Sequence, residues 1–237
     1  MEKMNKISNP SSSDQISDKA NANKSQQAYD TIRHFIMSGI FAPGTRLSER
    51  SLQAELNISR TPIKAALEKL TFEGYLESSE DKVAIVSKIG FPEALEIYEL
   101  RSVIESLSAE LAASRRSEED LVDLDVCITE HRNCLTESIE AAEKYDAEFH
   151  MLIARASRNT QISRHLKPLI DHCQRVSVYH NQKNSNRVIR SLEQHEAILQ
   201  AIRAQNAEEA HAAMTIHMED VIAMTKNLMA EYYFMYK

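Results

Sequence analysis

The sequence has few glycine, proline and aromatic residues, and it has no tryptophan. Its 237 residues include 4 Gly, 5 Pro and 3 Cys, and aromatic residues make up 6% of the chain. A shortage of Gly and Pro, together with many Ala, Leu, Glu and Met residues, favours helices over strands. An odd number of cysteines without regular spacing argues against a disulfide framework and suits a reducing cytosol.

Long apolar segments are also lacking. No stretch approaches the roughly 18 apolar residues that a membrane span needs. The N-terminal "MEKMNKISNPSSSDQ" is polar and does not resemble a secretory signal. We therefore expect a cytoplasmic protein that does not associate with membranes. The apolar content of 43% is enough for the cores of one large domain or two smaller ones.

The net charge of −7 taken alone argues against a nucleic-acid-binding protein, but the charge is unevenly distributed. Residues 28–88 contain 8 Lys and Arg against 8 Asp and Glu, whereas residues 89–237 contain 16 against 24. The acidic excess therefore lies in the last two-thirds of the chain. A neutral first segment can still bind DNA if its basic groups share one face.

The composition divides the chain into three parts. Residues 1–27 are rich in Ser, Asn, Gln and Lys, which predicts a disordered arm, either a plain flexible terminus or a DNA-contacting extension. Residues 28–88 show three amphipathic helical segments followed by two short strand-like runs, the order of a winged helix-turn-helix. Residues 89–237 are helical throughout and predict an all-α bundle. The expected helices of the bundle are 91–115, 117–138, 140–157, 160–181, 187–204 and 206–235.

The segment "SRTPIKAALEKL" carries the candidate DNA-binding residues. Ser59, Arg60, Thr61 and Lys64 lie on the polar side of an expected helix whose first turn would enter the major groove. Arg50, on the preceding helix, could join them from the side. A merely solvated helix face is the usual explanation for an isolated segment of this kind, but here the whole helix-turn-helix and wing order is present.

The block "APGTRLSERSLQAELNISRTPIKAALEKLTFEGYLES" closely resembles the N-terminal domain of the GntR superfamily of bacterial transcription regulators. The resemblance implies that Arg50, Ser59, Arg60, Thr61 and Lys64 contact operator DNA. Two positions depart from the family pattern. Lys64 replaces the more usual Arg and loses its bidentate geometry. The tip of the wing reads "SSEDK", where the family commonly has a Gly.

Four potential metal ligands lie in the helical part. Asp146 and His150 are four residues apart and share a helix face, a spacing that also suits a simple surface salt bridge. His195 and His217 occupy apolar stripes on later helices, so both should point near the interior. One carboxylate and three imidazoles suit Zn²⁺, Ni²⁺ or Mn²⁺. The spacing alone does not bring the three helices together.

The segments "DAEFHMLIARASRN", "RSLEQHEAILQAI" and "AAMTIHMED" resemble the FCD effector domain of the FadR-type branch of GntR regulators, over about residues 90–230. The resemblance implies that Asp146, His150, His195 and His217 hold a divalent metal ion, most simply zinc, at the base of a ligand cavity. It also implies a small carboxylic-acid effector held by Arg101. Asn159 and Arg190 are further candidates for the effector pocket.

Two local alternatives remain open. Arg101 could instead form an ion pair with Glu105, four residues further on. Cys127, His131 and Cys134 share one face of an expected helix and form a rival zinc site that lacks an apparent fourth ligand.

The interpretation we favour is a homodimeric, ligand-responsive repressor that binds operator DNA and is not an enzyme. The alternatives are a metal-dependent enzyme of the helical domain and a DNA-binding protein whose bundle only dimerises.

Overall fold

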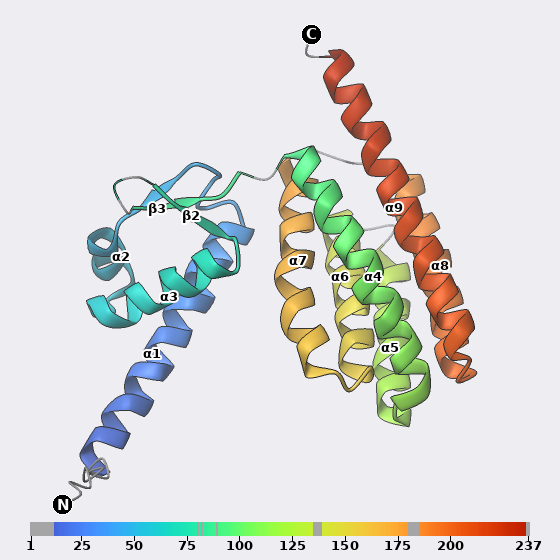
Figure 1. The fold of residues 1–237 in the computed structure, drawn as a ribbon, viewed down its shortest axis with the longest axis horizontal. Coiled ribbons are helices and arrows are strands. Elements are labelled where there is room, and N and C mark those ends of the chain that lie inside the picture. The colour runs from blue at the N-terminus through green and yellow to red at the C-terminus, as the bar shows by residue number, and fades with distance from the viewer. Residues whose placement is uncertain are drawn as a thin grey trace, which may run out of the picture. The chain divides into compact units, whose positions relative to one another are not determined.

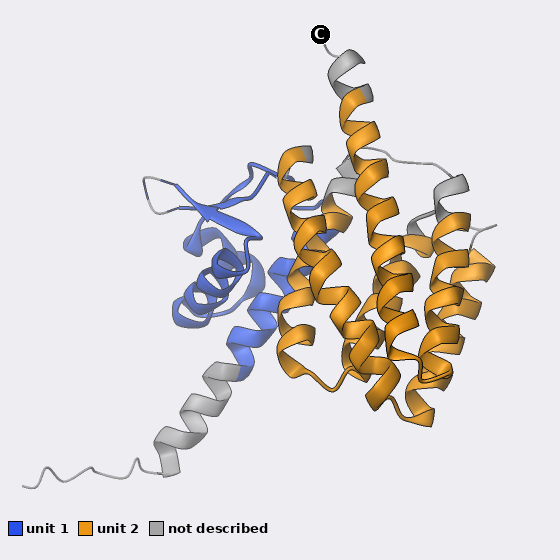
Figure 2. Cartoon of the chain, turned by 45° about the vertical axis from the view of Figure 1, so that its right-hand side comes forward, with its two compact units in different colours: residues 1–88 blue, residues 89–237 orange. Residues whose placement is uncertain are grey.

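The computed structural model describes residues 12–79, 81, 83–88, 90–134, 139–179 and 185–235. The chain forms two compact units, residues 1–88 and residues 89–237, shown in blue and orange in Figure 2. The first unit combines helices with a small sheet, and the second is built from helices. A winged helix-turn-helix followed by an all-α bundle, the fold class expected from the sequence, is confirmed.

Among its described residues, the first unit contains three helices and three short strands (Figure 1). Helix α1 contributes Ala28, Ile32 and Ile36 to its core, at a spacing of four residues that places them on one face. Helix α3 packs against α1 through its own buried stripe. The elements are α1 (Ser12–Met37), β1 (Arg46–Leu47), α2 (Glu49–Leu56), α3 (Arg60–Phe72), β2 (Leu76–Ser78) and β3 (Ala84–Val86).

Capping residues set the boundaries of the helix-turn-helix. Ser48 caps α2, and its side chain accepts a hydrogen bond from the backbone N–H of Ser51 at 3.0 Å. Asn57 ends α2 in the left-handed conformation, with φ of 52°. Gly74, with φ of 79°, follows α3 in the region that glycine adopts at least cost, so the chain can turn into β2.

The wing is a three-stranded antiparallel sheet in the order β1–β3–β2. In its register Leu76 faces Val86, and Arg46 faces Ile85. The sequence predicted the β2–β3 hairpin but not β1, because a two-residue strand has no periodicity from which to recognise it.

The predicted disordered arm is wrong for residues 12–27, which belong to α1. Elongating an existing helix costs much less than nucleating one, and no Gly or Pro interrupts Ser12–Met37. The packed part of α1 can therefore extend toward the N-terminus. Residues 1–11, the remainder of the predicted arm, lie outside the described residues.

The second unit is a bundle of six helices in the part of the chain that the structure describes (Figure 1). Helix α4 packs along α9 and also contacts α6, α7 and α8. Its buried Ala109, Ala112 and Ala113 have small side chains that let neighbouring helices approach closely. The helices are α4 (Phe91–Arg115), α5 (Glu118–Cys134), α6 (Ile139–Ala156), α7 (Thr160–Tyr179), α8 (Ser185–Arg203) and α9 (Ala207–Met235).

These helices agree with the expected ones to within two residues wherever the structure describes the chain, and the expected helix ends at residues 138 and 181 lie outside the described residues. Within the described residues, none of the helices combines the length and apolar character that a membrane crossing requires.

Candidate metal centre and nucleic-acid surface

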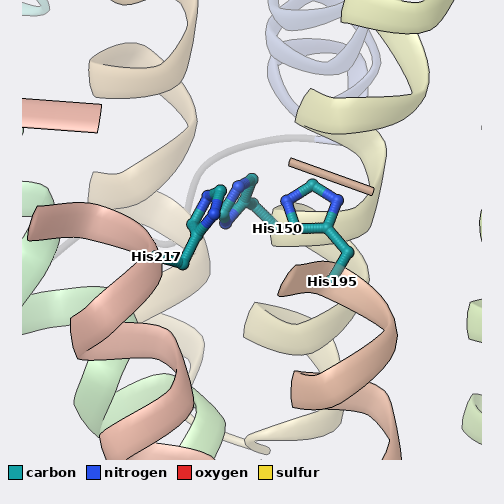
Figure 3. A group of neighbouring side chains, drawn as sticks. All are labelled: His150, His195 and His217. Atoms are coloured by element: carbon teal, nitrogen blue, oxygen red, sulfur yellow. The ribbon is translucent and has the colours of Figure 1, made fainter. Parts of the chain in front are cut away.

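Three histidines from three helices meet inside the bundle. His150 comes from α6, His195 from α8 and His217 from α9, and candidate donor atoms of the three rings lie within 4.8 Å of one another (Figure 3). Their exposed fractions are 1%, 0% and 2%. The packing of α6 and α9 on α8 thus supplies the convergence that the sequence spacing could not show.

Polar neighbours occupy one ring nitrogen of two of these histidines. Nδ1 of His150 contacts Oε2 of Glu105. Nδ1 of His217 lies 3.0 Å from Oε1 of Gln194. Both rings are therefore oriented with Nε2 available, the arrangement by which outer partners usually orient histidine ligands of a metal.

Several buried nitrogens in this cluster have no hydrogen-bond partner within the described part of the chain. They include Nε2 of His150 and Nδ1 of His195. Buried polar atoms without partners are rare in native proteins and call for a water molecule or an ion. The donors therefore fit a metal ion.

The protonation states favour the same conclusion. Burial, and next the neighbouring His150, lower the pKa of His217 to about 4, although Asp146 and Glu105 oppose the shift. Burial, and next His217, hold the pKa of His195 well below its ordinary value. These two imidazoles are neutral near pH 7, and the neutral ring is the form that binds a metal.

Asp146 lies beside the three-histidine cluster but is not one of its members. Its Oδ1 lies 3.7 Å from Nε2 of His195 and accepts a hydrogen bond from Oγ of Ser191 at 2.8 Å. The side chain is about one-third exposed and lines the adjacent cavity. The structure therefore brings Asp146 next to His195 on another helix, which a salt bridge confined to the surface of α6 would not do.

Arg101 and Glu105 form the ion pair that their spacing allowed. Nε of Arg101 lies 2.6 Å from Oε1 of Glu105, and both side chains are buried. Burial alone would raise the pKa of Glu105, but Arg101, and then His150, lower it to about 2. Burial alone would lower the pKa of Arg101, and Glu105 reverses that shift. Because Arg101 also lines the cavity, the ion pair and an effector contact are compatible.

A cavity of about 60 Å³ opens next to the histidines. Arg190 lies in its lining with 65% of its side chain exposed, and it pairs with Asp220 at 2.5 Å. The lining residues are Tyr98, Arg101, Asp146, His150, Arg190, Ser191, Gln194, His217, Asp220, Val221, Met224, Thr225 and Leu228.

The effector role predicted for Asn159 is not supported, because Asn159 is absent from this lining. Its Oδ1 instead accepts hydrogen bonds from the backbone N–H groups of Gln161 and Ile162 at the start of α7. An asparagine at a helix N-terminus commonly caps the helix in this way.

Sequence reasoning missed three polar neighbours of the candidate ligands, Ser191, Gln194 and Asp220. It placed Glu105 beside Arg101 but not beside His150. The spacing of His217 and Asp220, three residues apart, does place them on one face of α9. That α8 would supply the intervening Gln194 depends on tertiary packing.

The rival cysteine site is poorly suited to zinc. Sγ of Cys127 donates a hydrogen bond to the carbonyl of Tyr145. Burial, and next Glu148, raise the pKa of Cys127 to about 12, which disfavours the thiolate that zinc requires. His131 and Cys134 are buried too, yet the histidine cluster is the one group of possible metal ligands among the described residues.

The candidate DNA-binding residues are exposed on the first unit. Arg60 and Lys64 have side-chain exposures of 76% and 61%, and with Arg50 they line a groove that runs between α2, α3 and the wing. Ser59 and Thr61 are exposed at the start of α3. Ser59, Arg60, Thr61 and Lys64 thus lie at or near the N-terminal end of α3, where backbone N–H groups also favour phosphate. Arg50 lies on α2 and lines the same groove.

Carboxylates accompany two of these basic side chains. Nε of Arg60 lies 2.5 Å from Oε2 of Glu49, and Nζ of Lys64 lies 3.7 Å from Oε1 of Glu68. In the wing, Asp81 pairs with Arg46 at 3.4 Å. Glu80 and Lys82, the other charged residues of the predicted wing tip, lie outside the described residues.

Comparison with known families agrees with both halves of this arrangement. A model described as "Bacterial regulatory proteins, gntR family" matches residues 24–85, and one described as "FCD domain" matches residues 96–220, more than half of the chain. The chain belongs to the GntR family and carries an FCD domain. GntR regulators bind operator DNA and are not enzymes. FCD domains are known to bind metal ions.

Relatives of this GntR regulator span nearly its whole length. It is 26% identical over 210 residues to the HTH-type transcriptional regulator YdhC of Bacillus subtilis (strain 168), covering 86% of this chain and 92% of the relative. It is 25% identical over 211 residues to the HTH-type transcriptional repressor RspR of Escherichia coli (strain K12), covering 87% and 90%. The solved structure of McbR/YncC from E. coli matches with a TM-score of 0.73 and 19% identity, covering 86% and 97%. At that identity the match shows the fold alone.

Proposed function

We propose that this GntR regulator is a homodimeric repressor whose helical unit holds a divalent metal ion and releases operator DNA when a small carboxylic acid binds there. The observation that carries the proposal is the meeting of three buried imidazoles beside a cavity lined by two arginines. Residues 1–27, 28–88 and 89–237 are then, in that order, an N-terminal extension, a DNA-binding domain and a metal- and effector-binding domain.

The metal ligands are His150, His195 and His217, with Asp146 as the fourth. Three imidazoles and one carboxylate suit Zn²⁺, and Ni²⁺ or Mn²⁺ are alternatives. Elemental analysis of the purified protein tests this site, together with zinc titration of the protein after chelation. The double variant Asp146→Ala, His150→Ala should lose the metal. Full metal content in that variant would show that the site is elsewhere.

The size of the cavity and the two arginines in its lining, which also contains Asp146 and Asp220, support a small acid as the effector. A volume of about 60 Å³ holds only a few water-sized groups, each needing roughly 10–15 Å³. A carboxylate could bind the metal and the guanidinium of Arg101, with Arg190 at the exposed edge. A thermal-shift screen of carboxylic acids against metal-loaded protein should find a stabilising acid. The same acid should have no effect on the metal-free protein.

Operator DNA is contacted by Arg50, Ser59, Arg60, Thr61 and Lys64. The exposure of four of them at the start of α3, and of Arg50 on α2 in the same groove, supports this assignment. In an electrophoretic mobility assay, Arg60→Ala should weaken binding to the operator by about tenfold or more, as expected for the loss of a base contact worth roughly 1–3 kcal/mol. Arg164→Ala, which removes an exposed arginine from the bundle, is the matched control and should bind normally.

A homodimer is supported by an exposed apolar stripe on α4. Leu100, Val103 and Leu107 have exposures of 50%, 71% and 41% and lie at helical spacing on one face. Val103→Glu should shift the protein toward monomer in analytical ultracentrifugation and weaken its binding to a palindromic site. A dimer places two recognition helices on half-sites about 34 Å apart, or a multiple of that distance.

Repression follows if acid binding reshapes the bundle and so changes the relative placement of the two DNA-binding domains. Adding the acid to the metal-loaded protein should then release the operator. Tighter DNA binding under the same conditions would make the protein an activator or a co-repressed regulator instead.

A further inference from the structure

A chain of polar contacts runs behind His217. Its Nδ1 faces Oε1 of Gln194 at 3.0 Å, and Nε2 of Gln194 donates to Oδ2 of Asp220. Arg190 closes the chain with an ion pair to the same oxygen of Asp220 at 2.5 Å. The residues come alternately from α8 and α9, and all of them line the cavity.

The direction of every hydrogen bond in this chain is determined at its Asp220 end. An ionised carboxylate can only accept, and Asp220 forms an ion pair with Arg190. Gln194 must therefore turn its NH₂ group toward Asp220 and its carbonyl oxygen toward His217. A carbonyl oxygen can only accept as well, so Nδ1 of His217 must carry the proton. The lone pair of the neutral ring then lies on Nε2.

We propose that Asp220 is a positioning residue which, acting through Gln194, selects the tautomer of His217 that offers Nε2 to a metal ion. Without the carboxylate, the amide of Gln194 is equally satisfied in the reversed orientation. The reversed amide would present NH₂ to His217, draw the lone pair onto Nδ1 and leave the proton on Nε2. A proton at that position blocks coordination of a metal through Nε2.

His150 provides an internal comparison, since its Nδ1 contacts the carboxylate of Glu105 directly. A carboxylate in direct contact leaves only one orientation for the proton, so His150 needs no intermediary. His217 differs because an amide, which can be turned either way, stands between the ring and the charge. The dependence on a remote carboxylate is thus specific to His217.

The tautomer can be measured in metal-free protein labelled with ¹⁵N-histidine, from the long-range ¹H–¹⁵N correlations of each ring. His217 of the wild-type chain should carry its proton on Nδ1. Asp220→Asn should give a mixture of tautomers or the Nε2–H form, because the substituted side chain can itself donate or accept and so no longer orients the amide of Gln194. Glu219→Gln removes an exposed charge from the adjacent position of α9 and should leave the ring unchanged.

Exchanging the amide and the carboxylate between positions 194 and 220 tests the direction of these hydrogen bonds. Gln194→Glu alone places two carboxylates together, which should destabilise the fold, but it sets a carboxylate directly against Nδ1 of His217 and so should keep the Nδ1–H tautomer. In the double variant Gln194→Glu, Asp220→Asn, the amide now at position 220 can donate to the new carboxylate, which accepts from Nδ1–H. The double variant should therefore recover the wild-type tautomer, an effect that a merely structural loss would not produce.

The consequence for metal binding rests on the proposed function. The zinc affinity of Asp220→Asn should fall by about 10- to 100-fold, the usual effect of removing an outer partner of a ligand. The double variant should recover most of that loss. If Asp220→Asn does not fold, as judged by circular dichroism, Gln194→Leu offers a second variant. It removes the amide between Asp220 and His217 and should also allow both neutral tautomers of His217.

Different results would contradict the proposed metal site and the proposed positioning role of Asp220. A wild-type chain that binds no divalent metal would contradict the proposed metal site, but the tautomer of His217 would still decide the role of Asp220. An unchanged Nδ1–H tautomer in both Asp220→Asn and Gln194→Leu would overturn the positioning role. Asp220 would then serve only as the ion-pair partner of Arg190.

Discussion

Glu105 shows how one side chain can link the charge balance of a cavity to a candidate metal ligand. It is 1% exposed and contacts Arg101 on one side and His150 on the other. A buried ion pair adds little net stability, because desolvation offsets its attraction, but removing one partner leaves the other charge buried without compensation. The charge of the buried Arg101 is therefore compensated only while Glu105 is present.

We predict that Glu105→Gln lowers the free energy of unfolding of the helical unit by about 3–5 kcal/mol, the usual effect of leaving a buried charge unpaired. Glutamine keeps the size of the side chain and removes the charge. Urea unfolding monitored by circular dichroism measures the change.

The control for that measurement is Glu196→Gln. Glu196 pairs with Arg132 across the bundle, but about half of each side chain is exposed. Loss of such a pair should cost less than about 1 kcal/mol. Equal losses in the two variants would show that burial does not govern the Arg101–Glu105 pair.

The cysteines illustrate the same effect of burial on chemical reactivity. Cys127, Cys134 and Cys173 are all buried, and none of them forms a disulfide. Burial is the main cause that raises the pKa of Cys127 to about 12, and it raises that of Cys173 as well.

We therefore expect the folded protein to react slowly with Ellman's reagent at pH 8, since the thiolate is the reactive species. All three thiols should react in a denaturant. Immediate reaction of a thiol in the native protein would contradict its burial.

At the scale of the element, the two serines at the N-caps of α2 and α3 differ in their capping hydrogen bonds. Ser48 accepts a hydrogen bond from the backbone of α2, whereas Ser59, at the N-cap of α3, makes no side-chain capping hydrogen bond. The hydroxyl of Ser59 is thus available for another partner, which suits its proposed contact with DNA.

We predict that Ser48→Ala destabilises the DNA-binding unit by about 1 kcal/mol, the usual value of an N-cap. Ser59→Ala should change stability by much less but should weaken operator binding. Thermal unfolding and mobility-shift measurements on the same two variants separate these effects. The reverse pattern would exchange the roles of the two serines.

At the scale of the whole molecule, the separate cores of the two units imply two unfolding transitions. One core surrounds Ile32, Leu70 and Tyr75 in the first unit, and the other surrounds Phe149, Ile153 and Met214 in the second. A ligand stabilises only the unit to which it binds.

We predict that a chelator lowers the melting temperature of the helical unit and leaves that of the DNA-binding unit unchanged. Metal at a hundred times its Kd contributes roughly 2.7 kcal/mol of stability. Differential scanning calorimetry with and without zinc measures the shift.

Two histidine variants provide the comparison for this measurement. His195→Gln should abolish the response to metal. His211→Gln, which replaces a half-exposed histidine elsewhere on the bundle, should retain it. A response that persists in His195→Gln would place the metal outside the histidine cluster.

The sequence by itself determined the order of helices, the winged helix-turn-helix and the candidate ligands, because these depend on local signals. Apolar periodicity and the long GntR-like motif are both readable from neighbouring residues. The same local signals could not predict β1, which is two residues long, or the helical extension of residues 12–27 from a packed α1.

Only the tertiary structure decided which side chains surround the candidate metal ligands. Asp146 and His150 are close in sequence, but their meeting with His195 depends on the packing of α6 against α8. The contacts of Glu105 with His150, and of Gln194 with Asp220, join helices that are distant along the chain. Helical periodicity predicts which face of a helix a residue occupies. The contacts of that residue depend on which helix packs against that face.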